Sequence, residues 1–405
     1  MSTVREYLHF VGGYRRLLAF GVLAAMLSGF GQTFYIGLFN PQLREDFALG
    51  HSELGLMYGG ATLLSAALLA WLGGFYDRSD QRWFVSGTVI LLALGCLSLW
   101  TATGSWMLFC ALCALRLGGQ GLMSHIALTT MALRFQRGRG KAVAVAAMGF
   151  PLAEAVFPVV AVAALVVLEW NQLWLGGAVL LMASLPLLLW LLGGTAEGDV
   201  ADDKRGGRVA RDFSRREVLR DWRFVLLVPA AATPGFIVTI AFFHQIPLTE
   251  PKGWSTELVA SGLAFYALGH IIGLMSAGPL VDRLTGTRML VPSLLPLLGA
   301  ILVLTLFEAR WAAFVWPAML GLGQGLVATA LTALLAERYG LTHLGAIRAT
   351  LQAFTVVSTA LGPPLIGWLL DAGVAASALT AGLAAVVLIH ISLAQIALSA
   401  GVGDR

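Results

Sequence analysis

The chain has 405 residues, of which 58% are hydrophobic and 12% are charged, and its formal net charge is +4. A soluble protein carries about 25% charged residues, so this composition excludes a fold whose whole surface faces water. The net charge does not indicate nucleic-acid binding, because where the charges lie matters more than their sum. We expect an integral membrane protein that contacts the lipid bilayer and no nucleic acid.

Uncharged segments long enough to span a membrane follow one another along the chain, since a helix needs about 20 residues to cross about 30 Å of hydrocarbon. In the first half they are Leu17–Leu43, Leu54–Tyr76, Trp83–Leu115, Leu117–Leu133, Ala142–Leu168 (interrupted by Glu154) and Trp170–Ala196. The third run is too long for one span. Thr103-Gly104-Ser105 divides it, and Ser105 is a candidate N-cap of a fourth helix that ends at Arg134.

Six more segments follow a hydrophilic connector. They are Phe224–Thr249, Leu258–Val281, Met289–Phe307, Trp311–Ala336, Ala349–Leu370 and Ala372–Gly403. We predict an all-α membrane protein with twelve transmembrane helices. Its parts are an N-terminal six-helix bundle (1–193), a cytoplasmic linker (194–221) and a C-terminal six-helix bundle (222–405). Within the connector, Ser214–Arg223 is a candidate amphipathic helix on the inner leaflet.

Lys and Arg residues predict the orientation. If the N-terminus is inside, 21 of the 26 basic residues lie in inward-facing segments, and the outward-facing turns hold only Arg44, Lys252 and Arg310. Cytoplasmic loops of membrane proteins carry such an excess. We therefore expect both termini in the cytoplasm and a location in the cytoplasmic (inner) membrane.

The two halves repeat each other at a spacing of 204–206 residues. Gly73-Gly74-Phe75-Tyr76-Asp77-Arg78 corresponds to Gly278-Pro279-Leu280-Val281-Asp282-Arg283, Leu117–Leu122 to Gly321–Leu326, and Arg134-Phe135 to Arg338-Tyr339. Parallel repeats of this kind are a known transporter plan, in which the substrate site lies near the membrane midplane between the repeats. The repeat therefore predicts a transporter.

The repeated turn resembles the signature loop of the major facilitator superfamily, which reads Gly-x-x-x-Asp-Arg/Lys-x-Gly-Arg/Lys-Arg/Lys. In the first copy Asp80 replaces the glycine and Gln81 replaces a basic residue. The resemblance implies two six-helix bundles that alternate in access, with the signature loops acting as a cytoplasmic gate. The gate residues it implies are Gly73, Asp77, Arg78, Arg82, Gly278, Asp282, Arg283 and Arg288.

A weaker resemblance points to the monocarboxylate and oxalate/formate carriers. It rests on Pro41 at the end of helix 1 and on Phe243-His244-Gln245 near the end of helix 7. Those relatives usually hold the substrate carboxylate with an arginine in helix 8. The corresponding helix here has only His270, which leaves the carboxylate substrate open.

Two charged residues lie inside apolar segments, where an ion costs about 2.5–3.5 kcal/mol at the centre of the bilayer by insertion scales. Arg116 and Glu154 fall at similar depths on consecutive helices. We hypothesise that they form a buried pair. Protonation of Glu154 would then open it and couple transport to protons, whereas a permanent structural salt bridge is the alternative.

Other polar residues in apolar segments are candidates for the substrate or proton pathway, although each of them can also serve helix packing. They are His270, His244, Gln32, Tyr35 and Gln352. Glycine pairs such as Gly55-x-x-x-Gly59, Gly269-x-x-x-Gly273 and Gly321-x-x-x-Gly325 are expected to let helices approach closely.

We predict a monomeric secondary transporter that binds a small molecule and protons. A small organic anion is the favoured substrate, because Arg116 and His270 offer positive charge or hydrogen-bond donors. Efflux of amphipathic compounds and a non-transporting sensor of the same fold are the alternatives. We expect no enzyme activity, because HExxH, GxSxG and phosphate-binding loops are missing from the sequence. No cofactor and no metal are expected.

Overall fold

The computed structural model describes residues 10–76, 80–135, 138–194, 213, 215–340 and 343–399. These residues are helical apart from short turns, and no strand occurs among them. The chain divides into two compact units. Unit 1 comprises residues 1–49 and 60–203, and unit 2 comprises residues 50–59 and 204–405. Each unit is described by itself.

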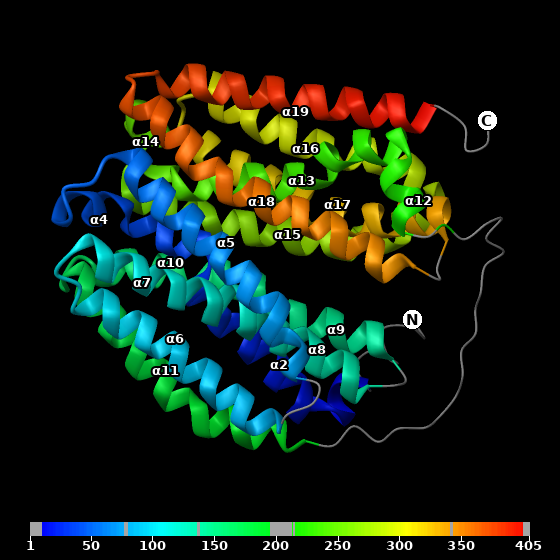
Figure 1. Cartoon of the computed structure of the whole chain (residues 1–405). Coiled ribbons are helices and arrows are strands. Elements are labelled where there is room, and N and C mark those ends of the chain that lie inside the picture. Colours follow the sequence, from blue (N-terminus) through cyan, green and yellow to red (C-terminus); the bar gives the residue numbers. More distant parts are fainter. Residues whose placement is uncertain are drawn as a thin grey trace. The chain divides into compact units, whose positions relative to one another are not determined.

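Unit 1 contains the helices of the N-terminal half (Figure 1). In chain order they are α2 (Arg15–Leu27), η1 (Ser28–Gly31), α3 (Thr33–Ile36), η2 (Gly37–Phe39), α4 (Asn40–Asp46), most of α5 (His51–Tyr76), α6 (Gln81–Trp100), α7 (Ser105–Leu115), the π-helical segment η3 (Arg116–Met123), α8 (Ser124–Arg134), α9 (Arg139–Ala147), α10 (Gly149–Ala164) and α11 (Trp170–Leu192).

Unit 2 contains Gly50, the first part of α5 (residues 51–59) and the helices of the C-terminal half. These are α12 (Arg215–Arg220), α13 (Trp222–Phe243), α14 (Gln245–Thr249), η4 (Glu250–Lys252), α15 (Thr256–Leu284), α16 (Gly286–Leu306), α17 (Ala312–Tyr339), α18 (Leu344–Asp371) and α19 (Ala376–Ser399). Figure 1 shows α16 and α13 beside α19, and both helices contact it.

The predicted number of spans is confirmed, with one of them broken. Eleven helices in the described ranges are long and apolar enough to cross a membrane. The first span makes the twelfth, as a pair of segments (Arg15–Gly31 and Thr33–Asp46) bent by 43°. The fourth span is continuous in space but changes from α-helix to π-helix and back between α7, η3 and α8.

Interlocked glycines join α15 to α17 in unit 2. A Cβ atom on Gly269 would lie 2.0 Å from the carbonyl oxygen of Ala318, and one on Gly321 would lie 2.0 Å from that of Tyr266. Backbone atoms cannot yield as a flexible side chain can, so these positions admit only glycine. The prediction that these glycine pairs serve close helix packing is confirmed.

The same kind of contact holds the first part of α5 inside unit 2. Gly55 lies against Pro363 and Pro364 of α18, where an added Cβ would be 2.8 Å from backbone atoms. Gly59 is equally tight against the carbonyl oxygen of Ala360, at 2.3 Å. Gly55-x-x-x-Gly59 therefore serves the packing of α5 on α18.

The end of the connector packs on unit 2. The candidate amphipathic helix appears as the shorter α12, and its Val218 is buried in a cluster with Phe224 and Tyr339. The amide of Phe213 donates a hydrogen bond of 3.1 Å to the carbonyl oxygen of Tyr339. The apolar side of α12 thus covers protein at Val218, while Leu219 is exposed.

Candidate functional site

The centre of the candidate site is the break in the first span. Gln32 has extended backbone angles (φ −87°, ψ 153°), which end η1 and begin α3. In a continuous helix the amide of Tyr35 would bond to the carbonyl oxygen of Gly31. Here it bonds to the carbonyl oxygen of Gln32, at 3.2 Å. The break therefore leaves the Gly31 carbonyl to be satisfied from outside its own helix.

Arg116 supplies that partner. Its Nη1 donates a hydrogen bond of 3.0 Å to the carbonyl oxygen of Gly31, and its Nε donates one of 3.0 Å to Oγ1 of Thr62 on α5. The arginine is only 1% exposed. Two of the five guanidinium N–H groups are thus assigned to protein oxygens, and the positive charge is fixed beside the break.

Glycine allows the two helices to approach closely enough for this contact. A Cβ on Gly119 would lie 2.6 Å from both the Cα and the nitrogen of Gly31, and a Cβ on Gly31 would lie 2.0 Å from the carbonyl oxygen of Leu115. Both glycines are therefore required by backbone packing. Gly119 lies in η3, the eight-residue π-helical segment that starts at Arg116.

A second, longer contact links the break to the fourth span. Nε2 of Gln32 lies 3.4 Å from Oγ of Ser124, and that hydroxyl in turn lies 3.4 Å from the carbonyl oxygen of Gly119 in the π segment. Gln32 is half-buried. The placement of Gln32 in the substrate or proton pathway stays a prediction.

Glu154 lies on the helix that packs against the other part of the break. On α10, Ala153 and Phe157 contact the first span at Gly29, where an added Cβ would be 3.0 Å from each side chain. Glu154 itself is 9% exposed. Arg116 and Glu154 therefore belong to two helices that both pack on η1, at Gly31 and at Gly29. Their direct pairing stays a prediction.

Tyr35 belongs to an aromatic cluster on the far side of the break. Its ring packs edge-on against Phe30, Phe39, Phe157 and Trp174, with ring centroids 5.2–5.8 Å apart. Aromatic pairs in this geometry contribute about 0.5–1.5 kcal/mol each beyond the area they bury. This packing fixes α3 against α10 and α11, so it stabilises the angle of the break.

The candidates of the C-terminal half lie in unit 2. His244 is 1% exposed, and its Nε2 donates a hydrogen bond of 2.9 Å to the carbonyl oxygen of Pro363 on α18. This bond fixes the tautomer, because a carbonyl only accepts. His270 is half-buried on α15, 5.7 Å from the ring of Tyr266. The side chain of Gln352 is exposed on α18.

The signature-loop residues lie at helix ends. Asp77 and Arg78 fall outside the described residues, and Gly73 lies on α5. Arg82 is exposed in the first turn of α6. In the second copy Gly278 lies on α15, where an added Cβ would meet no atom within 4 Å. Asp282, Arg283 and Arg288 are exposed at the junction of α15 and α16.

Sequence reasoning missed the groups that cap helix ends across the fold. Glu337 of α17 accepts hydrogen bonds from the amides of Gly286 (2.6 Å) and Thr287 (3.0 Å) at the start of α16. Asp371 of α18 does the same for His51 and Ser52 at the start of α5. Each carboxylate directly follows a predicted span: Glu337 follows Trp311–Ala336, and Asp371 follows Ala349–Leu370. Their position after a span is the signal that could have indicated a capping role. The sequence does not show which helix each carboxylate caps, because that depends on tertiary packing.

Comparison with known proteins agrees with this architecture. The sequence profile of the Major Facilitator Superfamily matches residues 21–316 and 235–400. Two crystal structures of a bacterial homologue of the human lysosomal transporter Spinster superpose on the chain. One is described as inward-facing and unoccupied, and it has a TM-score of 0.64, 16% identity and 95% coverage of both chains. The other is described as inward-facing and occupied, with a TM-score of 0.64, 18% identity and coverage of 95% of this chain and 96% of that one.

At this level of identity the likeness concerns the fold. No curated protein sequence is significantly similar to the chain. The predicted all-helical architecture of two six-helix halves is confirmed by the match to these structures.

Proposed function

Because this chain belongs to the major facilitator superfamily, a family of transporters rather than enzymes, we propose that Arg116 and the break in the first span form the centre of proton-coupled transport of a small organic anion. Family membership makes the chain a multi-pass membrane protein that carries a small-molecule substrate by alternating access. The observation that carries the finer proposal is the buried guanidinium of Arg116, which donates to the carbonyl oxygen of Gly31.

Burial strengthens the attraction between the guanidinium of Arg116 and an anion. A fully hydrated arginine gains little from an added carboxylate, because water already solvates both ions. At a position that is 1% exposed, the surrounding dielectric is low and the attraction is correspondingly larger. The planar guanidinium also matches a carboxylate with two parallel N–H donors. A small carboxylate is therefore the substrate class that suits this centre.

Glu154 would provide the coupling to protons. When it is ionised, its charge competes with the substrate carboxylate for Arg116. When it is protonated, the charge of Arg116 is left for the substrate. Protonation of Glu154 and binding of the anion would then favour each other, and such reciprocal coupling drives co-transport of a proton and an anion.

Uptake into proteoliposomes tests the proposal. A panel of radiolabelled monocarboxylates and dicarboxylates is supplied outside, with and without an inwardly directed proton gradient. We expect gradient-dependent uptake by the wild-type protein, loss of most uptake in Arg116→Ala, and uptake without gradient dependence in Glu154→Gln. Arg348→Ala, which removes an exposed arginine of α18, is the matched control and should behave like the wild type.

Two results would overturn the proposal. Carboxylate uptake that survives Arg116→Ala would remove the argument for an anion site, and full gradient dependence in Glu154→Gln would remove the coupling role. A fluorescent amphipathic cation in the same vesicles tests efflux directly. Its transport, with no carboxylate moved, would replace the organic anion as the substrate class.

The proposal also covers the membrane location, the orientation and the oligomeric state of the protein. The excess of Lys and Arg in alternate loops supports a cytoplasmic membrane with both termini inside, and we expect the transporter to act as a monomer. Cysteine labelling of loop residues with a membrane-impermeant reagent tests the orientation. Light scattering of the protein in detergent tests the mass.

A further inference from the structure

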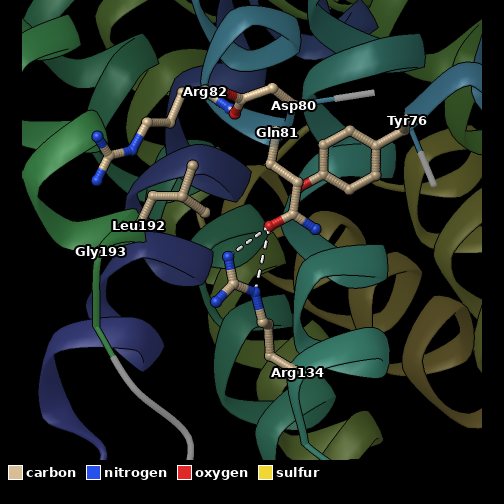
Figure 2. Close-up of a pocket in the computed structure, with 7 residues that line it drawn as sticks. All are labelled: Tyr76, Asp80, Gln81, Arg82, Arg134, Leu192 and Gly193. Carbon is tan, nitrogen blue, oxygen red and sulfur yellow. Dashed lines mark hydrogen bonds between the residues drawn. The ribbon is translucent and has the colours of Figure 1, made fainter. Parts of the chain in front are cut away.

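Unit 1 has a second polar site at the end where α5, α8 and α11 finish and α6 begins. A pocket of about 560 Å³ lies there, with Tyr76, Gln81, Arg82, Arg134 and Gly193 among its lining residues (Figure 2). The pocket is formed by the ends of transmembrane spans, so it lies toward one membrane surface. Most of the residues that line the pocket are polar or charged, whereas the neighbouring helix faces are apolar.

Arg82 brings a charge that the described part of unit 1 does not neutralise. Its side chain is exposed and donates no hydrogen bond to any described residue, and Figure 2 shows its guanidinium extended toward Gly193. Asp80 also lines the pocket, and the hydrogen bond that it accepts comes from the backbone of Arg82 and not from its guanidinium. Its Oδ1 accepts a hydrogen bond of 2.8 Å from the backbone amide of Arg82, so it serves as the N-cap of α6.

Arg134 is held in place by a neutral group. Its Nε and Nη2 donate hydrogen bonds of 3.2 Å and 2.7 Å to Oε1 of Gln81 (Figure 2). An amide oxygen orients the guanidinium without cancelling its charge, whereas a carboxylate would neutralise it. Gln81 stands where the signature loop of the family has a basic residue, so the local substitution has a structural consequence: a fixed and still positive Arg134.

Arg16 of α2 brings a third positive charge to the same edge. Its Nε donates a hydrogen bond of 2.9 Å to the carbonyl oxygen of Trp190, and its guanidinium lies 4.5 Å from the centre of that indole ring. A Cβ on Gly193 would lie 2.9 Å from Nη2 of Arg16. Among the described residues the pocket and its rim therefore hold three arginines and one carboxylate.

The pocket also borders helix faces with exposed apolar side chains. Trp83 on α6 is 79% exposed and Trp190 on α11 is 59% exposed, and further along the same helices Leu94 and Val179 are exposed as well. Exposed tryptophans gather at the level of the lipid headgroups. Figure 1 shows α6 and α11 side by side, and the two helices pack against each other. A basic pocket thus continues into an apolar, outward-facing surface.

We propose that this pocket binds the phosphate of an anionic glycerophospholipid whose acyl chains lie along α6 and α11. Guanidinium groups bind phosphate through pairs of charge-assisted hydrogen bonds, and Arg82 and Arg134 present two such groups to one cavity. Basic pockets at the ends of transmembrane helices are suited to lipid headgroups. The adjoining exposed tryptophans and aliphatic side chains favour a lipid over a soluble phosphate.

Lipid titration of the purified, delipidated full-length protein tests this site. Native mass spectrometry measures the binding of phosphatidylglycerol, with phosphatidylcholine as the zwitterionic comparison and glycerol 3-phosphate as the soluble phosphate. We expect saturable binding of phosphatidylglycerol that is stronger than that of the other two. Arg82→Gln should weaken it about fivefold, and the double variant with Arg134→Gln about thirtyfold, at about 1 kcal/mol for each arginine.

Arg288→Gln is the matched control, because it removes an exposed arginine from the second copy of the signature loop with the same change in net charge. Its affinity for phosphatidylglycerol should equal that of the wild type. Arg82→Gln is the decisive variant, since its side chain gives up no hydrogen bond within the described fold. Wild-type affinity in Arg82→Gln, equal binding of phosphatidylcholine, or equally tight binding of glycerol 3-phosphate would each overturn the proposal.

Discussion

Arg116 donates a hydrogen bond of 3.0 Å to the carbonyl oxygen of Gly31, and this contact joins the π-helical part of the fourth span to the broken part of the first. One bond thus satisfies two unusual requirements at once. The carbonyl left over at the break gains a donor, and the buried guanidinium gains an acceptor. The break and the arginine therefore depend on each other.

Removing the side-chain donors of Arg116 should destabilise unit 1. Arg116→Met leaves the Gly31 carbonyl and the Thr62 hydroxyl without this donor, and an unsatisfied buried polar group costs about 1–3 kcal/mol. Arg116→Lys offers one ammonium in place of a forked guanidinium and should lose less. Thermal unfolding of the protein in detergent measures the difference. An Arg116→Met protein as stable as Arg348→Met, which changes an exposed arginine, would contradict this interdependence.

The contact between Gly119 and Gly31 should tolerate no added methyl group. In Gly119→Ala the new Cβ would lie 2.6 Å from backbone atoms of Gly31, so the two spans must move apart and the bond from Arg116 must lengthen. Overpacking of this kind typically costs about 1–3 kcal/mol. We expect a lower unfolding temperature and reduced transport.

Gly87→Ala is the control for that substitution. Gly87 lies inside α6 in unit 1, and a Cβ there would meet no atom within 4 Å. Alanine is the better helix former by about 1 kcal/mol, so Gly87→Ala should keep or raise the unfolding temperature. If both alanine variants behaved alike, the glycine contact would not limit the approach of the two spans.

The fifth and the first span both depart from a regular helix, and their sequences predict these irregularities to different degrees. The fifth span (Gly140–Ala164) continues as one span with a single turn residue, Met148, between α9 and α10, and Pro151, which lacks an amide proton, indicates this irregularity. The first span has no proline near Gln32, only Gly29 and Gly31, which also suit close packing. Composition and repeat spacing therefore predict the twelve spans, whereas the break at Gln32 depends on a partner that the local sequence does not name.

The site residues show the same limit. Arg116 and Glu154 stand out in sequence because an ion in an apolar segment needs a partner. The partners that the structure gives Arg116 include a backbone carbonyl and the hydroxyl of Thr62. Neither group is distinctive in a sequence, because every residue has a carbonyl and many of the predicted spans contain threonine. The sequence thus indicates which charged residue needs partners, and the tertiary fold determines which groups bind to it.

Asp371 should protect the first turn of α5 from unfolding. Its carboxylate accepts hydrogen bonds from the amides of His51 (2.9 Å) and Ser52 (2.8 Å), and a negative group at a helix N-terminus is also favoured by the helix dipole. In Asp371→Ala, amide hydrogen exchange in residues 50–56 should become faster by about tenfold, as for loss of an N-cap. Mass spectrometry of peptides from that segment measures the exchange.

Asp371→Asn separates the hydrogen bonds from the charge. The amide oxygen still accepts one of the two bonds, so exchange should lie between that of the wild type and that of Asp371→Ala. Unchanged exchange in both variants would show that packing of Gly55 and Gly59 on α18 holds this turn without the carboxylate.

The second signature loop contains a strained residue at the position where the family pattern has glycine. Counting three residues from Asp282 gives Thr285, one residue before Gly286. Thr285 has φ 71° and ψ 155°, a region almost confined to glycine, and such strain costs about 1–3 kcal/mol. The rest of the fold compensates for it, since Glu337 holds the amides of Gly286 and Thr287.

Thr285→Gly should therefore stabilise the protein. Relief of the strain is partly offset by the greater flexibility of glycine in the unfolded chain, about 0.5–1 kcal/mol, so we expect a net gain of about 1 kcal/mol in the free energy of unfolding. Denaturant unfolding in detergent measures it. Thr305→Gly changes a threonine in the last turn of α16 whose φ is not positive, so it lacks the strain and should lose stability instead. A loss of stability in Thr285→Gly as well would show that Thr285 is not strained in its loop.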